Sequence, residues 1–217
     1  MSNLLLKELR LSASPIAYFF TLFGLMFFIP GYPILCGAFF PALGIYKSFD
    51  YAREANDTMF SALLPMAKRD VVKGRYCFVC LIELTALLIM AVSMIVRMTL
   101  LGDLPAYSSN FMMNADPFAL GAAFLLFGLF NLIFVGGFYR TGYKTGRPFL
   151  AYIIVVFPCI GVFETLHHIP GLQWLDEYTG EHMGSQLILL LCGAASYVLL
   201  TLVSYRKAAR NFEKIDL

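Results

Sequence analysis

Polar residues fall into a few short clusters along this chain, and long apolar runs separate them. No charged residue lies between Leu11 and Tyr46. A single helix of that length would extend over roughly 50 Å, too long for a hydrocarbon core of about 30 Å. The sequence Pro30-Gly31-Tyr32-Pro33 in the middle of the run is a strong turn signal. The run therefore predicts two short membrane-spanning helices, at about 14–30 and 32–48, that form a hairpin.

Four more apolar runs follow in the rest of the chain, and each is long enough to cross a bilayer. They predict spans at about 77–100, 117–139, 148–166 and 185–204. The fold class expected is therefore an all-α polytopic membrane protein with six transmembrane helices. Residues 1–217 would form a single transmembrane domain, with the hairpin at 14–48, a loop at 49–76, spans three to six at 77–204 and a tail at 205–217.

The first residues form an amphipathic pattern of their own. Leu5, Leu6 and Leu9 share one helical face, while Lys7, Glu8 and Arg10 are polar. This pattern favours an interfacial helix over residues 1–12 that lies along the inner membrane surface. The alternative is a simple extension of the first span.

Composition agrees with a membrane protein. Hydrophobic residues make up 59% of the chain and charged residues 14%, whereas soluble domains carry about 25% charged residues. Lys and Arg gather at the N-terminus, at 47–75, at 140–147 and in the tail, and the alternate connections at 31, 102–116 and 167–184 have none. By the positive-inside rule, both termini and the 47–75 loop are expected to be cytoplasmic, with the protein in the cell membrane.

The stretch from Asp50 to Tyr76 is the most polar part of the chain and is expected to contact another protein. Met59, Phe60, Leu63 and Leu64 fall on one face of a short helix. That helix can be capped by Asn56 or Asp57 and ends before Pro65. It is too short to be stable alone in water, so its apolar face needs a partner surface. A second helix is expected to begin near Lys68, and it would place four basic residues at the lipid headgroups: Lys68, Arg69, Lys73 and Arg75.

Motifs of known catalytic chemistry are missing from the sequence. It holds no G-x-x-x-x-G-K-[ST] for a phosphate-binding loop, no H-E-x-x-H and no G-x-S-x-G. Two ionisable residues, Glu83 and Arg97, fall within the third span, and such residues are candidates for a translocation pathway. They lie roughly 21 Å apart along a helix and cannot pair directly. Glu83 would line a cavity or accept hydrogen bonds from a neighbouring helix. If Arg97 is not part of a pathway, its side chain would extend outward to the interface.

Metal and redox sites are weaker alternatives. Cys77 and Cys80 form a C-x-x-C pair, but the pair opens an apolar helix and has no second pair beside it. The outer connection carries residues that could in principle form a metal site: Glu164, His167, His168, Glu181 and His182. Polar outer loops commonly hold such residues, and packing or solvation explains them equally well. No metal is therefore expected.

The loop and the spans together resemble the membrane subunit of ABC-2 type transporters. The loop reads E-A-N-D-T-M-F-S-A-L-L-P-M-A-K-R-D-V-V-K-G-R-Y. This is similar to the family's acidic start, short helix ending in Leu-Leu-Pro and basic lead into the third span. The pattern has its characteristic residues at the positions of Glu54, Leu64, Pro65, Val72, Lys73 and Tyr76. One departure is Ala67, where the family often has a Ser or Thr that caps the next helix.

The resemblance implies a non-catalytic permease subunit whose ATP and Mg are bound by a separate ATPase chain. Two ATPases and a second permease copy, identical or different, would complete the working unit, within the lipid bilayer and without nucleic acid. The family's coupling helix maps onto 56–64, and Met59 and Phe60 would enter the ATPase groove. The residues expected to couple to the ATPase are Glu54, Asp57, Met59, Phe60, Leu63, Leu64, Pro65 and Arg69.

The substrate expected is hydrophobic or amphipathic, such as a peptide, a lipid or a drug, because the spans carry few charges. Export is favoured over import by the resemblance. Two alternatives stay open. One is an ion-coupled secondary transporter, for which the acidic residues in the spans are the relevant feature. The other is a membrane immunity or scaffold protein.

Overall fold

Helices dominate the computed structural model. The structure describes residues 2–57, 60, 67–102, 104–108, 110–141, 144–177 and 182–214, and within these residues there is no β-strand. The all-α fold class expected from the sequence is confirmed. The helices are α1 (Ser2–Lys7), α2 (Pro15–Thr21), α3 (Cys36–Glu54), α5 (Lys68–Val96), α6 (Pro105–Ser108), α7 (Pro117–Phe130), α8 (Gly136–Arg140), α9 (Gly146–Thr165) and α10 (Met183–Glu213).

Turns of tighter or wider helix extend several of these elements. A 3₁₀ helix, η2 (Leu22–Phe28), continues α2. Three π-helical turns are present among the described residues: η1 (Glu8–Ser12) after α1, η3 (Arg97–Leu101) after α5, and η4 (Asn131–Val135) between α7 and α8. Two short 3₁₀ turns, η5 (Leu166–His168) and η6 (Gln173–Asp176), lie between α9 and α10.

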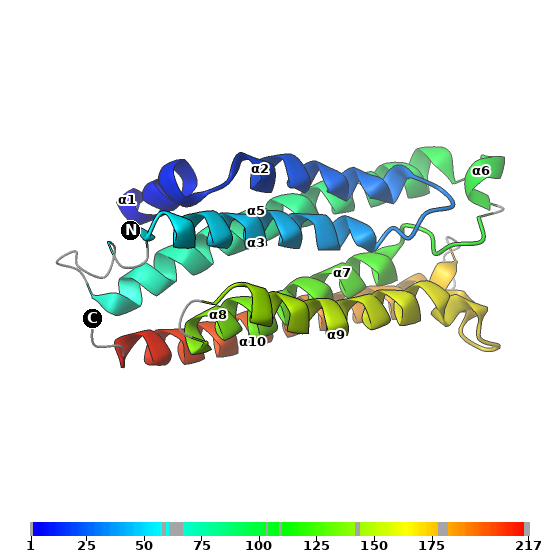
Figure 1. Cartoon of the computed structure of the whole chain (residues 1–217). Helices are drawn as coiled ribbons and strands as arrows, with labels where there is room; N and C mark the ends of the chain where they lie inside the picture. The colour runs from blue at the N-terminus through cyan, green and yellow to red at the C-terminus, as the bar shows by residue number, and fades with distance from the viewer. Residues whose placement is uncertain are drawn as a thin grey trace.

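The long helices lie side by side as an elongated bundle (Figure 1). Both chain termini lie at one end, together with the end of α3, the start of α5, the end of α8 and the start of α9. We call this the terminal end. The connection after η2, the helix α6, the end of α9 and the start of α10 lie at the opposite end. Along the sequence, connections that carry Lys and Arg alternate with connections that lack both, and this alternation corresponds to the two physical ends of the bundle.

Among the residues that the structure describes, four helices are long and apolar enough to cross a membrane: Lys68–Leu101, Pro117–Arg140, Gly146–His168 and Met183–Glu213. A fifth candidate is the pair Leu4–Ser12 and Pro15–Phe28, whose two parts meet at 97°. That near right angle separates α1 and η1 from the direction of the bundle, the geometry expected for an interfacial helix followed by a span. The position of the membrane around them stays a prediction.

The second expected span corresponds to α3, and its bounds differ from the prediction. The sequence predicted residues 32–48, whereas α3 begins at Cys36 and continues to Glu54. Its second half carries Lys47, Asp50, Arg53 and Glu54, which is why α3 is not among the candidate spans. The prediction of six spans is therefore confirmed only in part, since four or five candidate spans are found among the described residues.

Small residues bring α7 and α10 together. A Cβ atom on Gly121 would lie 2.9 Å from the Cα of Leu190, and one on Gly193 would collide with the Gly121 backbone. Close approach of two backbones through small residues is the usual way in which membrane helices associate. The start of α7 is fixed by Asp116, whose side chain accepts a hydrogen bond from the backbone N–H of Ala119 at 2.7 Å.

The start of α5 lacks such a cap. Ala67 occupies the N-cap position with extended backbone angles, φ −64° and ψ 130°, and no side chain caps the first turn. We expect the substitution Ala67→Ser to stabilise the protein by about 1 kcal/mol, because a serine oxygen can accept a free N–H there. Thermal unfolding in detergent measures this. Ala67→Val is the control, and an equal gain from valine would contradict the capping explanation.

Candidate functional site

An ionic cluster at the terminal end joins three parts of the chain that are far apart in sequence. Arg75 of α5 lies 3.0 Å from Glu8 of η1 and 3.1 Å from Asp57, which follows α3. Lys7 of α1 pairs with the same Asp57 at 2.8 Å. Asp57 is thus held by both the N-terminal helix and the base of the third predicted span. We call Lys7, Glu8, Asp57 and Arg75 the inner cluster.

The inner cluster is largely shielded from solvent. Glu8 is 2% exposed and Arg75 is 5% exposed, and the Arg75 guanidinium also lies 5.0 Å from the ring centre of Phe49. The expectation that Arg75 lies at the lipid headgroups is therefore wrong. Its guanidinium turns into the bundle because two carboxylates and an aromatic face stabilise the positive charge there more strongly than the membrane interface does. Ser12 adds a hydrogen bond from its hydroxyl to Asp57 at 3.0 Å.

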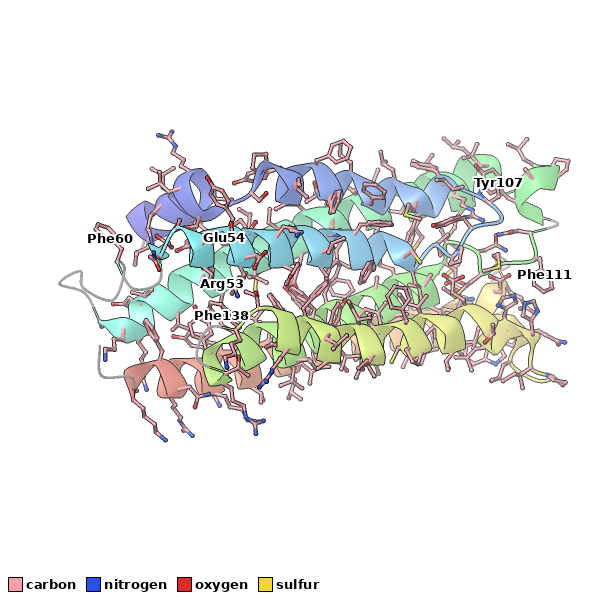
Figure 2. The ribbon with its side chains drawn as sticks, in the orientation of Figure 1. Arg53, Glu54, Phe60, Tyr107, Phe111 and Phe138 are labelled. Atoms are coloured by element: carbon pink, nitrogen blue, oxygen red, sulfur yellow. The ribbon has the colours of Figure 1, made fainter. Side chains whose placement is uncertain are left out.

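The other residues expected to couple to an ATPase lie around this cluster or outside the described residues. Glu54 is exposed at the last turn of α3, and Phe60 is 62% exposed (Figure 2). The backbone N–H of Phe60 donates to the carbonyl of Asn56 at 3.0 Å, the spacing of an α-helical turn. Arg69 pairs with Glu213 of α10 at 3.1 Å. Four of the expected residues fall outside the part that the structure describes: Met59, Leu63, Leu64 and Pro65.

A second polar cluster lies inside the bundle around Glu83 of α5. The Glu83 carboxylate is fully buried, and its Oε2 accepts hydrogen bonds from Asn131 Nδ2 and from the Tyr197 hydroxyl, both at 2.9 Å. Asn131 also donates to Thr201 at 2.9 Å. Of the two roles that the sequence left open for Glu83, the structure shows the hydrogen bonds to neighbouring helices. Glu83 joins α5, η4 and α10.

The cluster extends toward the terminal end along α10. Ser204 donates to the backbone carbonyl of Asn131 at 2.5 Å, and the hydroxyls of Ser204 and Tyr76 lie 2.7 Å apart. The π-helical turn η4 begins at Asn131, and the carbonyl of Asn131 accepts both the backbone N–H of Gly136, five residues on, and the hydroxyl of Ser204 from another helix. Local widening of the helix therefore coincides with the polar contacts that join α5, η4 and α10.

A third cluster closes the opposite end around Arg97, which is fully buried. Its Nη1 donates to the Phe27 carbonyl at 2.9 Å, and its Nη2 donates to Asn114 Oδ1 at 2.5 Å. The guanidinium also lies 4.6 Å from the ring centre of Tyr107. The interpretation that Arg97 extends outward to the interface is therefore wrong. The side chain turns inward because the end of η2 and the segment 110–116 present acceptors to it.

Asn114 connects Arg97 to a carboxylate. Asp176 of η6 accepts from the Asn114 backbone N–H at 2.6 Å and from its Nδ2 at 3.0 Å. Burial raises the pKa of Asp176, and burial raises the pKa of the neighbouring Asp116 well above its usual value. Arg97 acts in the opposite direction on both pKa values. Arg97, Asn114 and Asp176 form what we call the outer cluster.

The structure does not assemble the metal site considered from the sequence. Within the described residues, no group of three His, Cys, Asp or Glu side chains is placed to hold a metal ion, and Glu181 falls outside them. Glu164 instead accepts from the Leu35 backbone N–H at 2.9 Å, and His167 contacts the Phe111 carbonyl at 3.3 Å.

The sequence did not identify several residues as members of these polar clusters: Glu8, Arg75, Asn114, Asn131, Asp176 and Tyr197. One of them carried a visible signal. Asn131 is the single amide in the apolar run from Pro117 to Tyr139, and an isolated amide in a membrane span indicates an interhelical hydrogen bond. Glu8 and Arg75 showed no comparable signal, since both lie in segments with other charges around them.

Comparison with protein families decides the class of protein. The model of the ABC-2 family transporter protein family matches residues 3–213, nearly the whole chain. The chain belongs to this family. The match covers all three polar clusters, and it confirms the resemblance seen in the loop and the spans. Searches among curated proteins and among solved structures gave no significant match.

Proposed function

We propose that this ABC-2 family membrane protein is the permease subunit of an ATP-binding cassette exporter. A separate ATPase chain, present in two copies, would bind ATP and Mg and dock on the segment from Asp50 to Tyr76. Two permease chains, identical or different, would line the pathway. The match to the family over residues 3–213 supports the permease role. The absence of a phosphate-binding loop in the sequence supports a separate ATPase.

The single observation that carries the coupling role is the position of Asp57. It lies at the start of the expected coupling helix at 56–64, and it is ion-paired to Lys7 at 2.8 Å and to Arg75 at 3.1 Å. A force on this segment would act directly on α1 and on the base of α5. Arg75 lies two turns before Glu83, so a shift of α5 would reach the buried contacts of Glu83 with η4 and α10.

The orientation follows from the same arrangement. The terminal end carries the Lys and Arg residues other than Arg97, and it would face the cytoplasm of a cell whose membrane holds the protein. α1 and η1 would lie along the inner surface, at 97° to α2 and η2. The substrate proposed is hydrophobic or amphipathic, because the helix faces turned outward from the bundle are apolar.

We expect the double substitution Met59→Asp, Phe60→Asp to abolish co-purification of an ATP-binding chain from detergent-solubilised native membranes. Phe60 is exposed, and a charge on an aromatic anchor of a protein contact removes most of its binding energy. Stoichiometry of the pull-down is the measurement. Leu11→Asp, an exposed apolar site at the same end but outside the segment from Asp50 to Tyr76, is the matched control and should leave the complex intact.

Glu83 provides the test of one of the two alternatives, an ion-coupled transporter. If wild type brings down no ATPase in mild detergent, the exporter proposal fails. The ion-coupled class then gains support if Glu83→Gln abolishes proton-linked transport, since glutamine keeps a hydrogen-bond acceptor for Asn131 and Tyr197 but cannot carry a proton. Retention of transport by Glu83→Gln would assign Glu83 to packing.

A further inference from the structure

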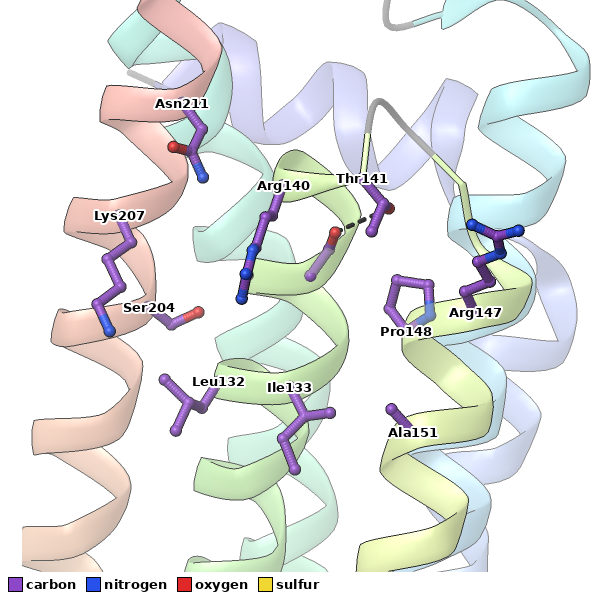
Figure 3. A pocket seen from close by; sticks show the side chains of 12 residues that line it. Leu132, Ile133, Arg140, Thr141, Arg147, Pro148, Ala151, Ser204, Lys207 and Asn211 are labelled. Carbon is purple, nitrogen blue, oxygen red and sulfur yellow. Dashed lines mark hydrogen bonds between the residues drawn. The ribbon is translucent and has the colours of Figure 1, made fainter.

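A cavity of about 640 Å³ opens at the terminal end, where α8, α9 and α10 meet (Figure 3). One part of its lining is apolar and comes from Leu132, Ile133 and Ala151. The other part carries three basic side chains from three elements: Arg140, Arg147 and Lys207. Its volume falls within the range of roughly 300–1,000 Å³ that is typical of small-molecule sites.

Tight helix contacts frame the cavity. A Cβ atom on Gly136 would lie 2.7 Å from Ser204 Oγ of α10, and one on Gly137 would lie 2.9 Å from Pro148 Cβ of α9. α8 thus touches both neighbours through its glycines. The cavity is the wedge-shaped space that remains between α9 and α10. Because α8 already contacts both of these helices, it cannot move closer to fill this space.

The charges of the cavity are all of one sign. No acidic residue lines it, and no carboxylate in the described residues pairs with Arg140, Arg147 or Lys207. Arg140 and Lys207 lie on facing elements, with Ser204 below them (Figure 3). The first turn of α9 holds Arg147, so the positive end of that helix dipole adds to the charge. The cavity is therefore suited to an anion.

The depth of the basic side chains matches that of lipid headgroups. Arg140 ends the candidate span Pro117–Arg140. Lys207 lies roughly 36 Å along α10 from Met183, beyond a hydrocarbon core of about 30 Å. Leu132 and Ile133 precede Arg140 by about two turns and so lie deeper, on the side of the hydrocarbon core. From the rim inward, the cavity is first basic and then apolar, and a phospholipid has the same order from its phosphate to its acyl chains.

We propose that this cavity binds one anionic phospholipid from the leaflet at the terminal end. The phosphate contacts Arg140 and Lys207, with Arg147 at the rim, and an acyl chain lies on Leu132, Ile133 and Ala151. The bound lipid fills the wedge between α9 and α10 and joins the connection at 140–147 to α10. This site lies apart from the segment from Asp50 to Tyr76 and does not depend on the presence of an ATPase.

Native mass spectrometry of the full chain in mild detergent tests the proposal, with phosphatidylglycerol and phosphatidylcholine of equal acyl chains as probes. Wild type should retain one phosphatidylglycerol more tightly than phosphatidylcholine. Arg140→Gln, Lys207→Gln should weaken phosphatidylglycerol binding about thirtyfold, since each cation near an anionic lipid contributes to its attraction. Lys73→Gln, Arg206→Gln removes the same charge from exposed residues outside the cavity and should leave the affinity unchanged.

A second variant tests the apolar wall without changing charge. Ala151→Trp should fill the wedge and prevent phosphatidylglycerol binding, while the thermal unfolding midpoint without lipid stays near that of wild type because Ala151 is exposed. Equal loss of lipid from both glutamine pairs would overturn the proposal in favour of non-specific surface attraction. Displacement of the lipid by excess inorganic phosphate, or unchanged binding to Ala151→Trp, would overturn it in favour of a site for a free anion.

Discussion

Replacement of Arg75 by methionine should destabilise the protein by about 3–5 kcal/mol, because it leaves Glu8 as a buried carboxylate without its guanidinium partner. Glu8 is 2% exposed, and its remaining basic neighbour is Lys7 at 3.7 Å. Asp57 would also lose one of its two ion pairs. Thermal unfolding of the purified protein in detergent measures the loss.

The double substitution Arg75→Met, Glu8→Met is expected to recover most of that stability. Replacing both members of a buried ion pair by apolar residues is often neutral, whereas removal of one is not. If Asp57 transmits movement from an ATPase to α5, the double variant will fold normally but will show reduced stimulation of ATP hydrolysis by transport substrate. Stability and coupling are thereby measured separately.

Arg69→Met is the matched control for this series. Arg69 pairs with Glu213 at 3.1 Å, but the two side chains are 61% and 44% exposed. An exposed ion pair contributes at most about 1 kcal/mol, so the control should unfold near the wild-type midpoint. A loss from Arg75→Met no larger than that from Arg69→Met would contradict the buried inner cluster.

The helices of this protein could largely be predicted from the sequence, because their boundaries are set by local signals. The start of α5 was expected near Lys68, and the helix begins there, after the extended residue Ala67. The Asp116-Pro117 pair begins α7 close to the expected position, with an N-cap side chain followed by proline. The end of α3 was predicted six residues early, because charged residues were assigned to a loop although they continue the helix to Glu54.

The polar clusters could not be predicted in the same way, because each depends on contacts between distant segments. Arg97 meets a carbonyl 70 residues earlier in the chain and an amide 17 residues later. Hydropathy alone gives such an arginine two options, extension to the interface or burial, and burial is chosen by acceptors that only the folded chain brings together. Glu83 was identified as a candidate, but its partner Tyr197 lies 114 residues away.

Arg97→Met should destabilise the opposite end by about 3 kcal/mol near neutral pH, because hydrogen bonds from a charged donor to Phe27 and Asn114 are lost together. Arg97→Lys should recover only part of this loss, since an ammonium cannot span both acceptors as the guanidinium does. Unfolding midpoints in detergent provide the comparison. If the unfolding midpoint of Arg97→Met equals that of wild type, the buried guanidinium makes no net contribution to the stability of the folded protein.

The loss caused by Arg97→Met should also depend on pH. Burial raises the pKa of Asp176, and Arg97 opposes that rise, so the folded-state pKa should rise further in the variant. A carboxyl with a raised folded-state pKa stabilises the protein fully below its unfolded pKa, and that contribution is lost as pH rises through the folded-state value. The midpoint of Arg97→Met should therefore fall more than that of wild type as the pH rises above about 4, the ordinary pKa of an aspartate in an unfolded chain.

The carboxyl responsible can be identified by a second substitution. Adding Asp176→Asn to Arg97→Met should remove most of the extra pH dependence, because an amide does not titrate. Asp116 is the other buried carboxyl that Arg97 influences, and His167 also lowers the pKa of Asp176. If Asp116→Asn flattens the profile and Asp176→Asn does not, the titrating group is the N-cap of α7. Parallel profiles for wild type and Arg97→Met would instead show that Asn114 alone satisfies Asp176.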